Sequence, residues 1–211
     1  KFHNRQYRNA VPTHVEAGRA TVAYDTAATV MNEVLGQLRE GKGLDSAKVK
    51  AAISPMIDSV MRNQDAMAWL VHLRKRDSYT YHHSLASSVW AVILGRHLGF
   101  DRQGLDTLAM GGLLLDIGKA KIPNELLVKV GPLDDVERTM MRKHVELGMK
   151  MVRTTPGVNA DVIAMIEGHH ERHDGSGYPK GLAGADIPVF GRIAGLIDSF
   201  DAMTTKRPYA A

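Results

Sequence analysis

The stretch LDTLAMGGLLLDIGK, residues 105–119, decides the fold class of this chain. Its apolar residues recur at helical spacing, so Leu105, Leu108 and Gly112 share one face with Asp116. That face should be buried in a core, where an acidic side chain is uncommon. Burying a carboxylate is costly unless the group is paired or holds a metal. The stretch therefore predicts a core helix that turns a paired or metal-binding aspartate inward.

Helical periodicity also governs the rest of the chain, and no convincing alternating β pattern occurs. The predicted fold class is therefore all-α, a helical bundle with an N-terminal helical hairpin. The hairpin, within residues 1–73, either serves as a linker or homodimerisation element that leads into the domain of residues 74–211, or simply packs against that domain. The expected helices cover 14–40, a second from Asp45 or Ser46 to Leu70 with a kink at Pro55, and then 83–99, 102–118, 134–153, 160–173 and 187–204.

Composition narrows the class of protein. The 211 residues include no cysteine, which excludes disulfides and cysteine-ligated zinc. The net charge is +4, but Lys and Arg are spread along the chain, so nucleic acid is not an expected partner. There is no apolar run of about 18 residues and no signal peptide, which predicts a cytoplasmic protein without a membrane span. The chain starts at Lys1 and stops abruptly after Ala211, so we expect a fragment of a longer protein.

Five successive helices each turn a histidine or an aspartate onto the stripe that should be buried. One such residue has an ordinary explanation, as a hydrogen-bonded core histidine or an aspartate that caps a neighbouring helix. Five in one bundle favour a metal site, which bundles commonly build from inward side chains on facing helices. Imidazole and carboxylate ligands without thiolate suit iron, manganese or zinc. The residues on these stripes are His83 and His97, Asp116, His144, His169 and His170, and Asp198.

Several motifs in the second two-thirds of the chain resemble those of the HD-GYP domain, a branch of the HD phosphohydrolase superfamily. They are YTYHHS (79–84), DIGKAKIP (116–123), HHERHDGSGYPKG (169–181) and DSFDAMTTKRPY (198–209), in that order. The resemblance spans about residues 74–211. It implies a bacterial phosphodiesterase that hydrolyses cyclic di-GMP to pGpG or GMP. The implied cofactor is one or two divalent ions, iron or manganese, with zinc and nickel as alternatives.

The resemblance also assigns residues to roles. Asp116 would bridge two metals, and Lys119 would place a fixed positive charge at the scissile phosphate. Tyr178 and Arg207 would contact the guanine end of the substrate, and Asp201 would support that site. Tyr79 stands where some family members have a glutamate that binds a third metal, so at most two are expected. The implied metal ligands are His83, Asp116, His144, His169, His170 and Asp198.

One position departs from the family pattern, because Leu115 replaces the histidine of the His-Asp pair. One metal would then keep only His83, Asp116 and Asp198, while the other keeps its full set. We expect one firm and one weak site. Three outcomes stay open: a phosphodiesterase of reduced activity; a degenerate module that binds cyclic di-GMP or partners such as GGDEF-domain proteins; and a broad HD-type phosphatase for nucleotides. Cyclic GMP-AMP is an alternative ligand, and Leu115 could also simply extend the apolar core.

Overall fold

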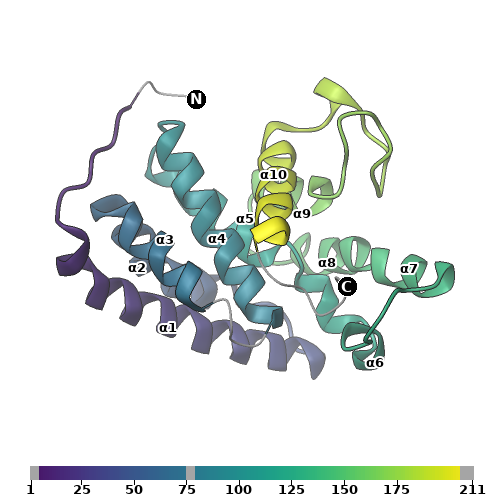
Figure 1. Ribbon diagram of the computed structural model, residues 1–211. Coiled ribbons are helices and arrows are strands. Elements are labelled where there is room, and N and C mark those ends of the chain that lie inside the picture. The colour runs from purple at the N-terminus through teal and green to yellow at the C-terminus, as the bar shows by residue number, and fades with distance from the viewer. Residues whose placement is uncertain (1–4, 75–78, 205–211) are drawn as a thin grey trace.

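The computed structural model describes residues 5–74 and 79–204, the second range with its side chains from His82 onward. In these ranges the regular elements are helices, which confirms the all-α prediction. Figure 1 shows α1 along one side of the molecule, beneath α2, α3 and α4. None of the described helices is both long and apolar enough to cross a membrane. The helices are α1 (Thr13–Arg39), α2 (Ser46–Arg62), α3 (Gln64–Leu73), α4 (Tyr79–His97), α5 (Arg102–Leu114), η2 (Ile117–Lys121), α6 (Asn124–Leu127), α7 (Asp135–Arg142), α8 (His144–Val152), α9 (Ala160–Gly168), η3 (Gly184–Asp186) and α10 (Val189–Thr204).

The second expected helix is divided at Asn63 into α2 and α3. Extended backbone at Asn63 ends α2, and the Asn63 side chain accepts hydrogen bonds from the N–H groups of Asp65 and Ala66 to begin α3. Pro55 lies inside α2. An asparagine cap satisfies helix N–H groups that have no partner within the helix. Periodicity does not reveal this break, because the apolar spacing continues across it.

Two more expected helices are divided beside inward-facing residues. The helix predicted over 102–118 ends at Leu114, and Asp116 lies in the turn before η2. The helix predicted over 134–153 separates into α7 and α8 at Lys143, so that His144 begins α8. A capping box between Asp134 and Glu137 starts α7. Both divisions place a metal-ligand candidate at a helix end, where its backbone is not confined to the helical register.

The last part of the bundle differs from prediction in two places. The helix expected over 160–173 ends at Gly168, so His169 and His170 follow α9 and do not continue it. His97 is exposed at the end of α4, so its predicted place on a buried stripe is wrong. Periodicity alone put it there, because the position is in phase with His83. The buried face of this end of α4 carries Gly95 and Arg96, and Gly95 lies against Leu105 and Leu108, so His97 falls beside that face and not on it.

A single apolar core runs through the N-terminal helices and the rest of the bundle. It joins Ile53 of α2 to Leu105 of α5, and Met31 of α1 also belongs to it. Helix α1 contacts α2, α3, α4 and η2, and α4 packs against α5 and α10. The N-terminal helices therefore pack on the rest of the bundle. This packing connects α1 to two elements of the candidate site, α4 and η2.

The link between α1 and α4 includes a buried polar contact. The Tyr24 hydroxyl lies 2.9 Å from Nδ1 of His82, and both side chains are only 2% exposed. His82 is thus turned toward α1, whereas its neighbour His83 faces Asp116 and Asp198. Buried polar groups that lose their partner are expensive to leave unsatisfied. Tyr24 therefore stabilises the segment of α4 that carries His83.

Replacing Tyr24 with Phe should lower the free energy of unfolding by about 1–2 kcal/mol, because it strips a buried hydrogen bond from His82. Urea unfolding followed by circular dichroism measures the change. Tyr7→Phe is the matched control. The Tyr7 hydroxyl also donates a hydrogen bond, to the Phe100 carbonyl at 2.8 Å, but the contact is only partly buried and water can replace it. Equal losses in the two variants would contradict the prediction.

Candidate metal centre

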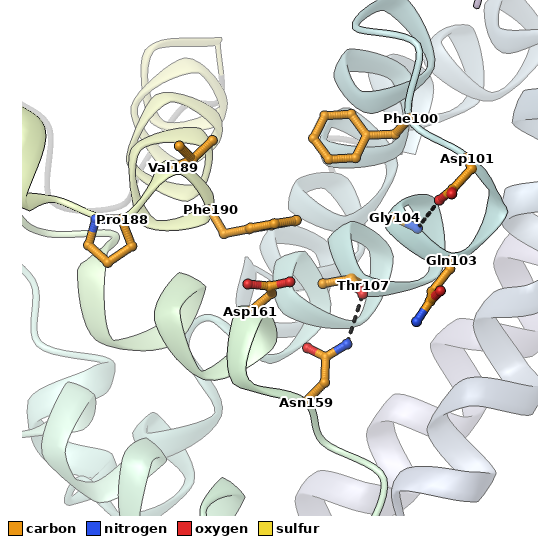
Figure 2. Close-up of a pocket in the computed structure, with 10 residues that line it drawn as sticks. All are labelled: Phe100, Asp101, Gln103, Gly104, Thr107, Asn159, Asp161, Pro188, Val189 and Phe190. Carbon is orange, nitrogen blue, oxygen red and sulfur yellow. Dashed lines mark hydrogen bonds between the residues drawn. The ribbon is translucent and has the colours of Figure 1, made fainter. Parts of the chain in front are cut away.

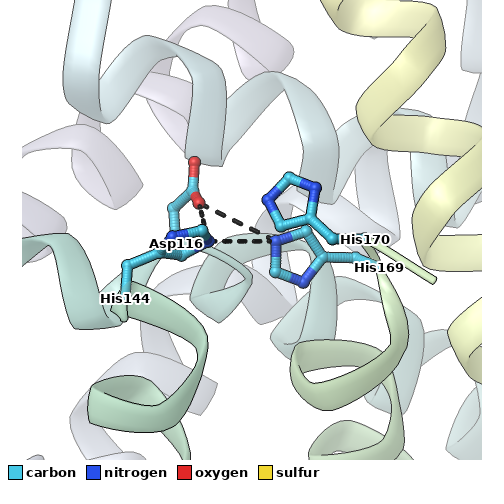
Figure 3. Close-up of side chains that lie close together, drawn as sticks. All are labelled: Asp116, His144, His169 and His170. Atoms are coloured by element: carbon cyan, nitrogen blue, oxygen red, sulfur yellow. Dashed lines mark hydrogen bonds and ion pairs between the residues drawn. The ribbon is translucent and has the colours of Figure 1, made fainter. Parts of the chain in front are cut away.

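Four side chains converge in the interior of the bundle, as Figure 3 shows: Asp116, His144, His169 and His170. Each offers a ligand atom, and these atoms lie within 4.8 Å of one another. Nε2 of His144 lies 3.3 Å from Oδ1 of Asp116 and 3.4 Å from Nε2 of His169. Nε2 of His169 lies 3.9 Å from the same carboxylate oxygen. The structure thus brings together the set that the sequence assigned to the firm metal site.

Gly118 allows Asp116 to approach His144. A Cβ atom at Gly118 would lie 1.9 Å from the His144 carbonyl oxygen and 2.5 Å from the backbone nitrogen of Gly148. The backbone of η2 therefore lies directly against α8, a contact that only glycine permits. Because Gly118 follows Asp116 by two residues, this contact sets the aspartate beside the first residue of α8.

Glycines also hold α9 against α10. A Cβ atom at Gly168 would lie 3.0 Å from Cα of Gly191, and one at Gly195 would lie 3.0 Å from the His169 carbonyl oxygen. The two helices can therefore pack with their backbones close together. This packing brings Asp198 of α10 next to the pair that follows α9, with Oδ2 of Asp198 3.9 Å from Nδ1 of His170.

Two of the imidazoles are oriented by the backbone. Nδ1 of His144 lies 2.8 Å from the Met141 carbonyl, and Nδ1 of His169 lies 2.8 Å from the Ile166 carbonyl. A carbonyl only accepts, so each Nδ1 carries the proton and each Nε2 presents its lone pair to the centre. Such outer partners typically fix metal-binding histidines.

Burial keeps these rings neutral. It is the largest influence on all three histidines and lowers the pKa of His144 to about 4 and that of His170 to about 2, while the pKa of His169 is also lowered. Burial alone would raise the pKa of Asp116, but the nearby Lys119 and histidines hold it well below its usual range. Neutral imidazoles around an ionised carboxylate are the protonation states that a divalent metal requires.

The other oxygen of Asp116 faces a different set of side chains. Oδ2 lies 2.6 Å from Nζ of Lys119 and 3.5 Å from Nε2 of His83. Nε2 of His83 is also 3.3 Å from Oδ1 of Asp198. The Asp116 carboxylate therefore lies between two groups of potential ligands. His144 and His169 face Oδ1, with His170 in the same cluster, and His83 lies near both Oδ2 and the second carboxylate, Asp198.

Asp201 lies behind His83. Its Oδ2 is 2.6 Å from Nδ1 of His83, and the residue is 1% exposed. Burial tends to lower the pKa of His83, but hydrogen bonds to Asp198 and Asp201 and the charge of Asp116 raise it to about 9. The sequence reading placed Asp201 in support of the substrate site. The structure instead sets it against a candidate metal ligand, in the carboxylate–histidine arrangement that orients such ligands.

Leu115, which precedes Asp116 in the chain, is buried. It is 2% exposed, follows the last residue of α5 and belongs to the apolar core. An apolar residue therefore directly precedes Asp116 in the chain. The group on the His83 side has three candidate ligands, His83, Asp116 and Asp198, where the other side has four.

The loop between α9 and α10 folds over His170. The Tyr178 ring stacks on the His170 ring, with centroids 4.6 Å apart and planes at 24°. Buried Glu171 holds the loop by accepting hydrogen bonds from the N–H groups of Lys180 and Leu182, at 2.8 and 2.9 Å. Glu171 lies within the motif of residues 169–181, but no role was assigned to it from the sequence. Its anchoring role depends on the folded loop, so periodicity offers no signal for it.

Two residues with roles implied by the family resemblance lie outside the part of the chain that the structure describes. Arg207, predicted to contact guanine, lies outside the described residues, and so does the Tyr79 side chain that was used to limit the number of metals. Lys119, by contrast, is placed next to Asp116, with its side chain 25% exposed. It can therefore reach both the buried carboxylate and the opening of the site.

The residues of the three-histidine side fit a metal ion. Imidazole nitrogens and carboxylate oxygens lie about 2.0–2.2 Å from zinc, so two ligands of one ion are at most about 4.4 Å apart. The separations of 3.3, 3.4 and 3.9 Å among Asp116, His144 and His169 fall within this limit. Lone pairs directed inward and neutral rings complete the match. These residues would hold a divalent ion with mixed nitrogen and oxygen ligands.

A second hollow, shown in Figure 2, lies at the opposite end of α9. It has a volume of about 460 Å³ and includes Phe100, Phe190 and Asp161 in its lining. The Asn159 side chain that caps α9 donates a hydrogen bond to Thr107 there, at 2.9 Å. The lining residues include no histidine, so the hollow lacks the ligand set of the centre at His169.

The fold and the centre define a class: an all-helical protein whose bundle holds a buried His–Asp site of the metal-binding type. A family model described as "HD domain" matches residues 64–211, well over half of the chain. The chain therefore belongs to the HD-domain family, and its resemblance to HD-GYP domains is confirmed.

Curated relatives include enzymes for two cyclic dinucleotides. "Cyclic di-GMP phosphodiesterase PA4108" of Pseudomonas aeruginosa is 34% identical over 194 residues, covering 92% of this chain and 47% of that protein. "3'3'-cGAMP-specific phosphodiesterase 2" of Vibrio cholerae is 37% identical, covering 68% of this chain and 27% of that protein. The chain thus spans less than half the length of these relatives.

A solved structure supports the fold. Bd1817, described as a HDG"Y"P protein from Bdellovibrio bacteriovorus, matches with a TM-score of 0.73 and 21% sequence identity. The match covers 92% of this chain and 63% of that chain. A match over 92% of the chain extends beyond residues 64–211, the region of the family model, and therefore includes N-terminal helices.

Proposed function

We propose that this chain is a metal-dependent phosphodiesterase that hydrolyses cyclic di-GMP. The observation that carries the proposal is the position of the Asp116 carboxylate, with Oδ1 toward His144 and His169 and Oδ2 toward His83 and Lys119. A carboxylate shared in this way suits a centre for one or two ions. Curated relatives named as cyclic di-GMP phosphodiesterases supply the substrate class.

In this proposal Asp116, His144, His169 and His170 would hold a divalent metal, which would supply an activated water and a positive charge for the phosphate. The chain's own residues prepare the site. The Met141 and Ile166 carbonyls keep the Nε2 lone pairs of His144 and His169 directed inward. Lys119, partly exposed, provides a fixed positive charge for the substrate phosphate. Asp201 orients His83, and Tyr178 forms the wall of the site over His170.

A second candidate function is a module that binds cyclic di-GMP without cleaving it. The ion pair between Lys119 and Oδ2 of Asp116, next to buried Leu115, favours it. The ammonium neutralises the oxygen that would bridge to a second ion. Such a module would act through partners, and GGDEF-domain proteins are the partners we propose. A homodimer formed through the N-terminal helices also stays a proposal.

The test is to load the purified chain with Mn²⁺ or Fe²⁺ and incubate it with cyclic di-GMP and 3'3'-cGAMP. We expect bound metal near one ion per chain and pGpG or GMP as products, separated by chromatography. A nucleotide panel tests for the broader phosphatase. Tight binding of cyclic di-GMP without turnover under both metals would overturn the enzymatic proposal and select the binding module.

A further inference from the structure

Arg142 lies at the edge of the candidate metal centre. It is the last residue of α7, it is exposed, and it precedes His144 by two residues. Its guanidinium carbon lies over the Tyr178 ring, 4.8 Å from the ring centroid. The same ring is stacked on His170. Arg142 is therefore separated from a proposed metal ligand by a single aromatic ring.

The ring holds the arginine without using its hydrogen-bond donors. A cation over an aromatic face gains about 0.5–1 kcal/mol at an exposed site. Within the described part of the chain, the Arg142 guanidinium makes no hydrogen bond or ion pair. Exposed arginines often lack such partners, so that fact alone would mean little. The nearby Arg172 differs, because its guanidinium lies 3.4 and 3.3 Å from the carbonyls of His169 and Glu171.

We infer that Arg142 is a specificity residue for cyclic dinucleotides and binds the phosphate that is not being cleaved. This inference rests on the proposed function. A cyclic dinucleotide carries two phosphodiesters in one small ring, so when one lies at the centre beside Lys119, the other must lie close to its rim. A planar guanidinium presents paired N–H donors that match two phosphate oxygens. Arg142 offers such donors at the rim, and Tyr178 keeps them in place.

The inference predicts a loss that depends on the substrate. Arg142→Gln should raise KM for cyclic di-GMP by about 10- to 100-fold, the effect of losing a hydrogen bond to a charged group. The value of kcat should change little, because the reacting phosphate does not touch Arg142. Bis(p-nitrophenyl) phosphate has only one phosphodiester, so its hydrolysis should be unchanged. Arg142→Lys should recover part of the loss, since it restores the charge but not the paired donors.

The matched control is Lys143→Gln, which removes a neighbouring exposed cation that has no contact with Tyr178 recorded in the structure. Equal KM values for Arg142→Gln and Lys143→Gln would overturn the inference. So would an equal loss on both substrates, because that pattern indicates a general electrostatic or structural effect. If the wild type hydrolyses neither substrate, the proposed function fails. Calorimetric titration of the wild type and Arg142→Gln with cyclic di-GMP then decides the inference, which fails if the two affinities agree.

Discussion

Asp116→Asn should abolish metal binding and phosphodiesterase activity together. Both carboxylate oxygens are in use, with Oδ1 3.3 Å from Nε2 of His144 and Oδ2 2.6 Å from Nζ of Lys119. An amide keeps the shape but removes the negative charge and one of the two acceptor oxygens. The Lys119 ammonium would then repel an incoming cation. Metal affinity should fall by more than the ~10- to 100-fold typical of losing an outer partner of a ligand.

Metal titration by calorimetry and cyclic di-GMP hydrolysis measure the two losses. Asp186→Asn is the matched control, because it makes the same chemical change at an exposed residue of η3. Circular dichroism separates loss of metal from loss of fold, and we expect helicity to be retained. An Asp116→Asn protein with normal metal content and normal rate would show that the carboxylate is not a ligand, and the proposed centre would be wrong.

Much of the fold follows from apolar spacing alone. The period that aligns Leu105, Leu108 and Gly112 describes the buried face of α5, and Asp116 is buried as predicted although it lies in the turn after that helix. What periodicity does not reveal is where a helix stops while its apolar spacing continues. The break at Asn63 depends on a side-chain cap, and the end of α5 depends on how closely η2 can approach α8. Both are properties of tertiary packing.

The candidate site is predictable to a similar degree. Helical periodicity alone placed Asp116 and His144 on predicted buried faces, and the structure brings the two residues together. The same rule failed at His97, because the buried face of that end of α4 carries Gly95 and Arg96, and His97 is turned away from it. The contact of Asp201 with His83 and the role of Arg142 could not be predicted. Each joins elements far apart in the chain, and no spacing within one helix encodes such a contact.

Leu115→His should create a second metal site and raise the rate of cyclic di-GMP hydrolysis. The group about Oδ2 of Asp116 has His83 and Asp198 but lacks a fourth ligand, and Leu115 precedes Asp116 in the chain. An imidazole there would complete four ligands, the number that a tetrahedral site requires. Bound metal should rise from about one to about two ions per chain when excess Mn²⁺ is present and then removed by gel filtration. Metal analysis and initial rates on the same samples give both results.

The substitution also has a cost, which the controls must separate from the gain. Leu115 is 2% exposed in the apolar core, so a polar ring there should destabilise the metal-free protein. Leu115→Asn also places a polar side chain in the apolar core, but its amide is a poorer metal ligand than an imidazole. Leu114→His puts an imidazole at a fully buried neighbour about 100° away around the helix. Only Leu115→His should recover stability when metal is added, because a ligand that binds only the folded state stabilises that state.

If Leu115→His gains neither metal nor rate while remaining folded, residue 115 lies outside the reach of the metal. His83 and Asp198 would then serve to hold Asp116 and Lys119 in place, and catalysis would depend on the three-histidine side alone.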